Sequence, residues 1–366
     1  MTGHVHVGVA LDGYGWHPEA WRHTPDPLPV TSGRYWVDTV LTAERGLLDF
    51  VTFDDALTPQ RRRRPDIEPR WPAGRPDAVL VAARVAPLTR HIGLMPVATV
   101  THTEPFHVSK AVATLDFISR GRAGWQVRVS GTAHEAELFG RRDVRGADLF
   151  GEASDAVEVA RRLWDSWEDD AVIRDVASGR FVDRDKLHYI DFVGEHFSVK
   201  GPSITPRPPQ GQPVVAALAH TLAAYQFATR SADLVFITPR SDDDLDTLID
   251  QVAAAGEVAG GAAPKIYADV YVSFSGNVDP RSDAAIFEGT ATELVDLILR
   301  WHDDGVDGVR LRPAVHATDL PVIADEVVPI LQGKGVFRTA YRAGETLRAR
   351  LDLPVAVNRY AKAGPS

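Results

Sequence analysis

Hydrogen-bonding side chains gather in one stretch of the chain, residues 99–140, where two apolar runs end. The first run covers residues 92–97 and the second covers 123–129. The polar side chains on or just after these runs are Thr99, Thr101, His102, Gln126 and Ser130. A strand, loop, helix and strand in this order form a parallel crossover unit, which places both strand ends side by side. We therefore expect these side chains to form one wall of a ligand pocket.

Three histidines near predicted strand ends could act as acids or bases, namely His17, His102 and His134. Histidine suits this chemistry because its side chain titrates close to neutral pH. For each of the three, a structural hydrogen-bonding role is the alternative. Arg22 and Arg128 could hold a carboxylate, sulfonate or phosphate, although Arg128 could equally form a salt bridge inside the fold.

Several kinds of chemistry are disfavoured by what the sequence lacks. The 366 residues include no cysteine, which excludes disulfides, thiolate metal sites and a cysteine nucleophile, and which fits a reducing cytoplasm. The histidines show no HExxH motif and no evident 2-His-1-carboxylate spacing, so we expect no metal site. The formal charge of −10 argues against nucleic-acid binding, and no apolar run is long enough to cross a membrane.

Strands and helices must alternate to position these side chains. Apolar runs and helical periodicity alternate about eight times, and no GxGxxG motif follows the first strand. This pattern predicts an α/β fold, a TIM (β/α)8 barrel whose active site lies at the C-terminal ends of the strands. An alternating segment at 188–202 predicts a small hairpin inserted before the fifth strand. We expect residues 1–332 to form the barrel and 333–366 an extension that packs on the barrel or on a partner subunit.

Several long segments resemble one known family. They include THTEPFHVSKAVATLDFISRGRAGWQV, AERGLLDFVTFDD, LWDSWEDDAVIRDVASGRF and GVFRTAYRAGETLRARLDLP. Over nearly its whole length the chain is similar to the bacterial luciferase-like flavin monooxygenases, in the branch of the nitrilotriacetate and dibenzothiophene-sulfone monooxygenases. The resemblance implies a TIM barrel that uses O2 and reduced FMN, supplied by a separate flavin reductase, to oxygenate a small organic substrate. It also implies a homodimer or homotetramer.

The same resemblance implies roles for particular residues. Asp55 falls where the family has an aspartate near the flavin, with a helix N-cap as the alternative. Thr99 and Thr101 fall in the hydroxyl-rich turn that faces the isoalloxazine ring, and Gln126 replaces the usual asparagine. Thr221 stands where a serine binds the FMN phosphate at a helix N-terminus, which is a natural anion site. The side chains that we expect to bind flavin are Asp55, Thr99, Thr101, Gln126, Ser130 and Thr221.

Other positions depart from the family pattern. Ala219 and Ala224 occupy glycine positions of the phosphate turn, and alanine resists positive φ and close backbone approach. Tyr225 replaces an arginine, while Gly146 and Phe150 stand where the family has a histidine and a tyrosine that contact FMN. The insertion after the seventh strand is also shorter than in this branch. Two alternatives therefore stay open: a flavin-free barrel that acts as a binding or regulatory subunit, and a deazaflavin-dependent oxidoreductase.

Overall fold

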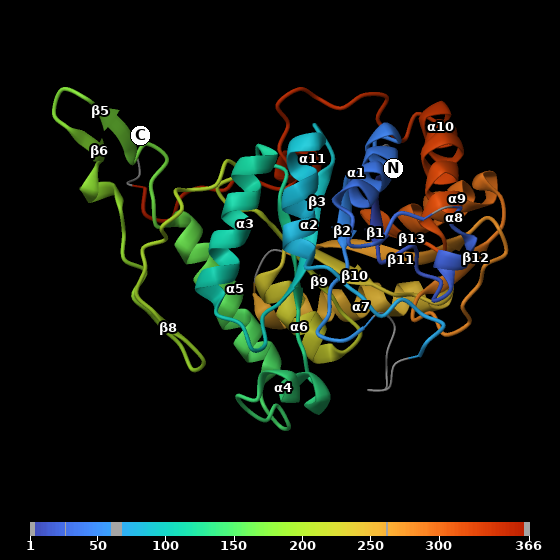
Figure 1. The fold of residues 1–366 in the computed structure, drawn as a ribbon, viewed down its shortest axis with the longest axis horizontal. Coiled ribbons are helices and arrows are strands. Elements are labelled where there is room, and N and C mark those ends of the chain that lie inside the picture. The colour runs from blue at the N-terminus through green and yellow to red at the C-terminus, as the bar shows by residue number, and fades with distance from the viewer. Residues whose placement is uncertain (1–3, 26, 60–67, 261–262, 362–366) are drawn as a thin grey trace.

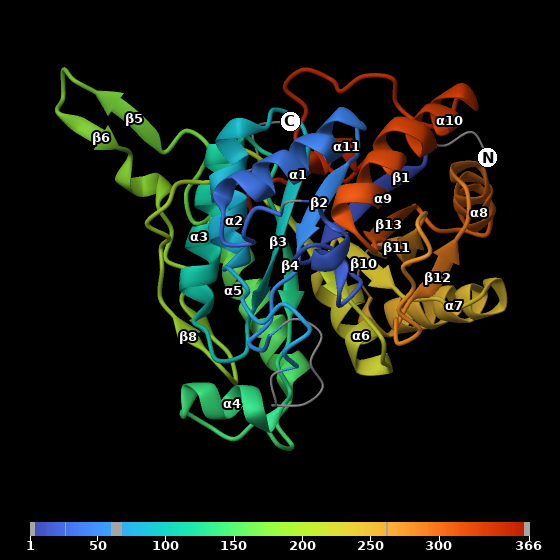
Figure 2. The same ribbon diagram turned by 45° about the vertical axis from the view of Figure 1, so that its right-hand side comes forward.

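A closed barrel of parallel strands forms the body of the molecule (Figures 1 and 2). The computed structural model describes residues 4–25, 27–59, 68–260 and 263–361. Each barrel strand pairs in parallel with its neighbours, and the last pairs with the first. In chain order the strands are β1 (His6–Leu11), β2 (Phe50–Phe53), β3 (Gly93–Thr99), β4 (Gly124–Arg128), β9 (Val214–Leu218), β10 (Leu234–Ile237), β11 (Lys265–Ser273) and β13 (Gly308–Pro313). The predicted TIM barrel is confirmed.

Helices connect the strands and cover the outside of the barrel. In chain order they are α1 (Gly33–Arg45), α2 (Ala78–Val85), α3 (Pro105–Ser119), α4 (Ala133–Phe139), α5 (Leu149–Asp165), α6 (Leu222–Ser231), α7 (Asp242–Ala259), α8 (Ala291–Asp303), α9 (His316–Val322), α10 (Val328–Gly333) and α11 (Leu347–Arg350). A π-helical turn, Ile323–Val327, joins α9 to α10. Short 3-10 helices lie at Ala20–His23, Ala86–Leu88 and Arg184–Lys186.

Large apolar side chains fill the N-terminal half of the barrel interior. Phe50, Met95, Phe236 and Tyr267 belong to one buried cluster there. Gly8 of β1 leaves room for this cluster, because a Cβ at this position would lie 2.4 Å from the Phe50 ring. With this half filled by side chains, a ligand can enter only from the C-terminal ends of the strands.

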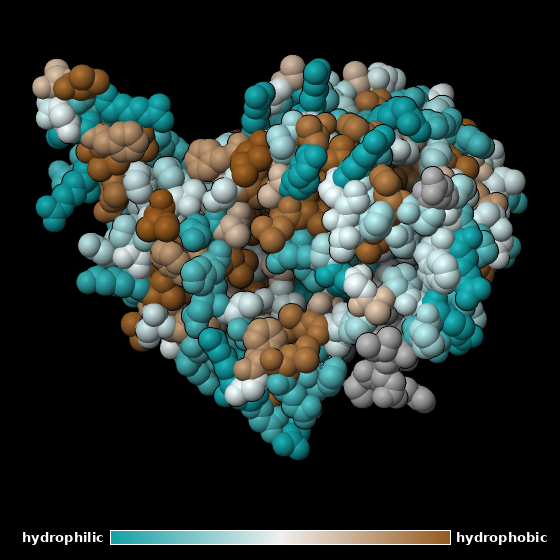
Figure 3. Space-filling view, in the orientation of Figure 1, coloured by the Kyte–Doolittle hydropathy of each residue, from teal (hydrophilic) through white to brown (hydrophobic). Residues whose placement is uncertain are grey.

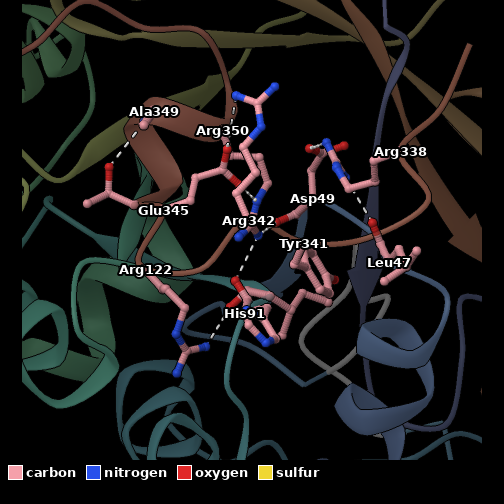
Figure 4. A network of polar contacts seen from close by, with 12 residues as sticks. Leu47, Asp49, His91, Arg122, Arg338, Tyr341, Arg342, Glu345, Ala349 and Arg350 are labelled. Carbon is pink, nitrogen blue, oxygen red and sulfur yellow. Dashed lines mark hydrogen bonds and ion pairs between the residues drawn. The ribbon is translucent and has the colours of Figure 1, made fainter.

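The segment after α10 runs across the end of the barrel opposite α4, at the top of Figure 1. Leu347 and Leu351 insert into the buried cluster that fills the barrel's N-terminal half. The guanidinium of Arg350 donates to the carbonyl of His91 at 2.7 Å, and Tyr341 stacks on the His91 ring at 4.8 Å (Figure 4). This part of the extension therefore closes the N-terminal end of the barrel, and its last residues, 362–366, lie outside the described part of the chain.

Two hairpins and one extra strand are inserted into the barrel. The predicted hairpin before the fifth barrel strand is confirmed as β7 (Phe192–Val193) paired with β8 (Ser198–Val199). A second hairpin, β5 (Val172–Asp175) with β6 (Arg180–Val182), was not expected and projects from the body (Figures 1 and 2). An unexpected strand, β12 (Ala285–Glu288), pairs in parallel with the end of β11.

Helix α8 begins with a capping box that can be tested directly. The hydroxyl of Thr290 accepts from the backbone N–H of Glu293, and the Glu293 carboxylate accepts from the backbone N–H of Thr290. Thr290→Ala is expected to lower the free energy of unfolding by about 1 kcal/mol in urea denaturation, because a helix N–H loses its acceptor. Thr114→Ala, inside α3 on the exposed surface, is the control and should change stability little. Equal losses from both substitutions would contradict the capping role.

Candidate active site

A layer of charged side chains crosses the middle of the barrel. Arg310 of β13 donates through Nε and Nη2 to the Asp269 carboxylate of β11, at 2.7 and 2.5 Å. It also donates through Nη1 to the Gln126 amide oxygen of β4 at 2.6 Å and to the Thr52 hydroxyl at 3.4 Å. Arg312, two residues further along β13, pairs with the same Asp269 carboxylate. All of these side chains are buried, so this layer forms the floor of the barrel mouth.

Above this floor lies a second group of paired charges. Arg75 donates to Asp54 at 2.7 Å and lies 3.3 Å from Asp12, and Asp12 and Asp54 directly follow β1 and β2. Arg128, at the end of β4, lies more loosely at 3.9 Å from Asp54 and is partly exposed. Burial alone would raise the pKa of Asp54, but Arg75 and Arg128 hold that pKa below its usual value. Asp54 is therefore ionised near neutral pH and fixes Arg75 at the mouth.

The opposite side of the mouth carries a histidine that the sequence analysis missed. His220 lies two residues after the end of β9, with its Nδ1 at 2.9 Å from the Thr238 hydroxyl and its Nε2 at 3.6 Å from Asp283. Burial lowers the pKa of His220, so the ring is neutral near pH 7 and able to accept a proton. The sequence feature that could have identified His220 is its position, after a predicted strand and immediately before the helix N-cap Thr221.

The start of α6 presents an exposed N-terminus at the mouth. Thr221 is the N-cap, and its hydroxyl accepts from the backbone N–H of Ala224 at 3.3 Å. Residues 221–223 are exposed, so the helix start is accessible to an anion. Ala219 and Ala224 are both buried in the main hydrophobic cluster, and their methyl groups therefore point away from this accessible start. Tyr225 is also buried in that cluster.

The structure links two of the three expected hydroxyl residues, Thr101 and Ser130, on the β3–β4 side. The backbone N–H of Ser130 donates to the Thr101 hydroxyl at 3.0 Å, and the Ser130 hydroxyl donates to Glu135 at 2.6 Å. Thr99 lies directly opposite Arg128 in the β3–β4 register and is half-buried. Thr101 and Ser130 therefore hold two loops together, while Thr99 is the last residue of β3.

The Asp55 carboxylate accepts hydrogen bonds from two backbone N–H groups. One belongs to Ala56, at 2.7 Å, and the other to Ala78, the first residue of α2, at 3.0 Å. These are the contacts of the helix-capping alternative, although Asp77 is the N-cap itself. Burial raises the pKa of Asp55.

The three histidines expected as acids or bases occupy different surroundings. His17 lies in the loop after β1, and its backbone N–H donates to the carbonyl of Ala314 after β13. His102 is buried with φ +72°, stacks on Phe139 at 4.8 Å and has no hydrogen-bond partner for either ring nitrogen among the described residues. His134 lies within α4. No contact among the described residues joins the three, so they do not form one acid–base cluster.

At the two positions where the family has a histidine and a tyrosine that contact FMN, this chain has Gly146 and Phe150, and neither has a polar side chain. Gly146 lies in the loop before α5 with φ +73°. The Phe150 ring packs 6.0 Å from the ring of Phe227.

Within the described residues, no three side chains of the metal-binding types His, Cys, Asp or Glu are grouped so as to hold an ion. No described helix is long and apolar enough to cross a membrane.

Comparisons with known proteins agree with this architecture. The model of the luciferase-like monooxygenase family matches residues 16–286. N-acetyl-S-(2-succino)cysteine monooxygenase of Bacillus subtilis (strain 168) is 30% identical, with 98% of each chain covered. Nitrilotriacetate monooxygenase component A of Aminobacter aminovorans is 28% identical with the same coverage. The crystal structure of a long-chain alkane monooxygenase covers 96% of each chain with a TM-score of 0.86 at 23% identity. The chain therefore belongs to the luciferase-like monooxygenase family and is a flavin-dependent monooxygenase.

Proposed function

We propose that the protein is the oxygenase component of a two-component system that receives reduced FMN from a separate flavin reductase. The observation that carries this proposal is the exposed start of α6 beside a polar barrel mouth, where Thr221 and the first-turn N–H groups would hold the phosphate. Bound reduced FMN would supply the electrons that activate O2 for transfer to a small organic substrate. Relatives are named for substrates as different as nitrilotriacetate, long-chain alkanes and dimethyl sulfide, so membership leaves the substrate open.

The β3–β4 wall offers polar groups for the flavin ring. Arg310 binds the amide oxygen of Gln126 and thereby orients the amide so that Nε2 is the donor available to a bound ring. The Thr99 hydroxyl lies on the neighbouring strand, opposite Arg128. Asp55, Thr101 and Ser130 act one step further away in this proposal, because their hydrogen bonds hold backbone segments of the wall.

Proton movement at the mouth is assigned to His220. Its ring is neutral near pH 7, and its Nε2 faces the mouth beside Asp283. Thr238 holds Nδ1, which keeps the ring orientation constant while Nε2 takes up or releases a proton. His17 remains a second candidate because its loop crosses the end of β13. His102 stacks on Phe139 of α4 and His134 lies within α4, so neither is assigned a proton-transfer role in this proposal.

Anaerobic titration with reduced FMN tests the cofactor. We expect a dissociation constant in roughly the micromolar range, typical of a diffusing co-substrate held by one anion site and a few ring contacts. On mixing with O2, the bound flavin should oxidise with spectral changes and rates that differ from those of free flavin. Stopped-flow absorbance measures both.

The deazaflavin serves as the control in the same titration. Binding of the deazaflavin with no binding of reduced FMN would favour hydride transfer and overturn the proposal. Binding of neither would favour the flavin-free barrel as a binding or regulatory subunit.

We also propose that the protein is a cytoplasmic homodimer or homotetramer. The projecting β5–β6 arm supports association, because its apolar side chains Val176 and Phe181 are 94% and 61% exposed. Figure 3 shows apolar side chains on the arm at the upper left. An isolated two-stranded hairpin is only marginally stable in water, so a second copy covering the arm would stabilise it. Light scattering in solution measures the mass, and a monomer would contradict this proposal.

A further inference from the structure

Arg312 lies at the C-terminal end of β13 in a position to contact a ligand. The side chain is buried, and its Nη1 pairs with the Asp283 carboxylate at 2.5 Å. Its guanidinium carbon lies 4.5 Å from the centre of the Trp16 ring, so one face of the cation is covered. The Nε atom is buried without a hydrogen-bond partner among the described residues. Arg312 is thus a preoriented guanidinium with unused hydrogen-bonding capacity.

The charge balance at the floor depends on Asp283. Two arginines, Arg310 and Arg312, share the single negative charge of Asp269. Asp283 therefore supplies the second negative charge, and without it the buried trio would carry one uncompensated positive charge. An uncompensated charge in such a buried position is strongly unfavourable, so an anion must occupy this place.

Unlike Asp269, which is fully buried, Asp283 lies where a ligand carboxylate could take its place. It belongs to the loop 274–284 between β11 and β12, and its side chain is 42% exposed. It also lines a surface hollow of about 440 Å³ formed by residues 280–286 and Arg240. Burial alone would raise the pKa of Asp283, but Arg312 and His220 bring that pKa below its usual value. A tethered, partly solvated carboxylate is a natural substitute for one that arrives with a ligand.

We propose that the substrate carries a carboxylate that displaces Asp283 and pairs with Arg312. This inference rests on the proposed function, because it places the substrate in the same barrel mouth. The planar guanidinium fork matches a carboxylate geometrically. In the structure, Arg312 already pairs with two carboxylates, those of Asp269 and Asp283. On displacement, Asp283 stays on its loop within reach of His220 Nε2, which lies 3.6 Å from it already. No net charge is buried by the exchange, since one carboxylate replaces another.

The test uses succinate as the probe and the full-length protein without flavin. Asp283→Asn keeps the shape of the side chain but removes its charge, so Arg312 lacks its second anion. This variant is expected to melt at a lower temperature than the wild type and to bind succinate about tenfold more tightly or better by calorimetry. Glu288→Gln, an exposed carboxylate-to-amide change on neighbouring β12, is the matched control and should behave as the wild type.

Two further measurements decide the chemistry. Arg312→Gln in the Asp283→Asn background should abolish the gain in succinate binding, and circular dichroism checks that this double variant is folded. Methanesulfonate and inorganic phosphate should bind the Asp283→Asn variant more weakly than succinate. Unchanged or weaker succinate binding by Asp283→Asn would overturn the inference, as would equal binding of all three anions.

Failure of this inference can be told apart from failure of the proposed function. Reduced FMN is titrated anaerobically into the same variants. Flavin binding with no enhanced succinate binding would overturn the carboxylate site alone. Enhanced succinate binding in a protein that binds no flavin would overturn the proposed function alone.

Discussion

Asp269→Asn is expected to lower the free energy of unfolding by about 3–5 kcal/mol, the cost of breaking a buried ion pair from one side. The carboxylate receives two hydrogen bonds from Arg310 and one contact from Arg312, and all three side chains are at most 2% exposed. The amide has no charge to offset either cation. Denaturant unfolding monitored by tryptophan fluorescence measures the loss.

Two comparisons make this prediction specific. Asp296→Asn is the control, because Asp296 is 59% exposed and 3.9 Å from Lys334; it should cost less than about 1 kcal/mol. The double variant Asp269→Asn/Arg310→Met should be more stable than Asp269→Asn alone, since it removes an orphaned cation. A loss as small as the control's would show that the buried network does not stabilise the barrel.

The barrel could be predicted because its strands are buried on both faces. Runs such as the one that forms β9 are almost entirely apolar, and each is followed by a segment with helical spacing. Strand β12 was not predicted, because it is only four residues long and forms by pairing with the end of β11. The β5–β6 hairpin escaped it because its alternating pattern includes exposed apolar side chains, Val176 and Phe181.

In the sequence, the charged floor is indicated only by two arginines within one short strand. Arg310 and Arg312 alternate within β13, which places both on the same face of the strand. That face could have been identified as the barrel interior, since Val309 and Leu311 on the other face of the strand are apolar. Their partner Asp269 lies 41 residues before Arg310, and only the barrel closure between β11 and β13 brings them together.

Position after a strand did not suffice to find the acid–base residues. His102 and His220 both follow barrel strands, β3 and β9. The His102 backbone adopts positive φ, and its ring stacks on Phe139 of α4. The His220 ring instead faces Thr238 and Asp283 at the mouth. The direction of a side chain after a strand depends on loop conformation, which the residue pattern alone does not determine.

The position of the flavin phosphate yields the second large effect. Thr221→Asp should weaken binding of reduced FMN by about 100-fold or more, because two like charges a few ångströms apart repel by several kcal/mol near a protein surface. The substitution should leave the fold intact, since aspartate is at least as good an N-cap as threonine and can accept the same bond from the Ala224 N–H. Anaerobic titration measures the affinity, and thermal unfolding verifies the stability.

The control for this experiment is the same substitution at another helix start. Thr346→Asp changes the N-cap of α11, which packs under the opposite end of the barrel, so flavin affinity should stay at the wild-type value. Thr221→Ala, which removes only the hydroxyl, should fall between the two, because the backbone N–H groups and helix dipole of α6 remain. If Thr221→Asp binds reduced FMN as tightly as Thr346→Asp does, the anionic end of the flavin is held elsewhere. The partly exposed Arg128 at the end of β4 would then be the next position to test.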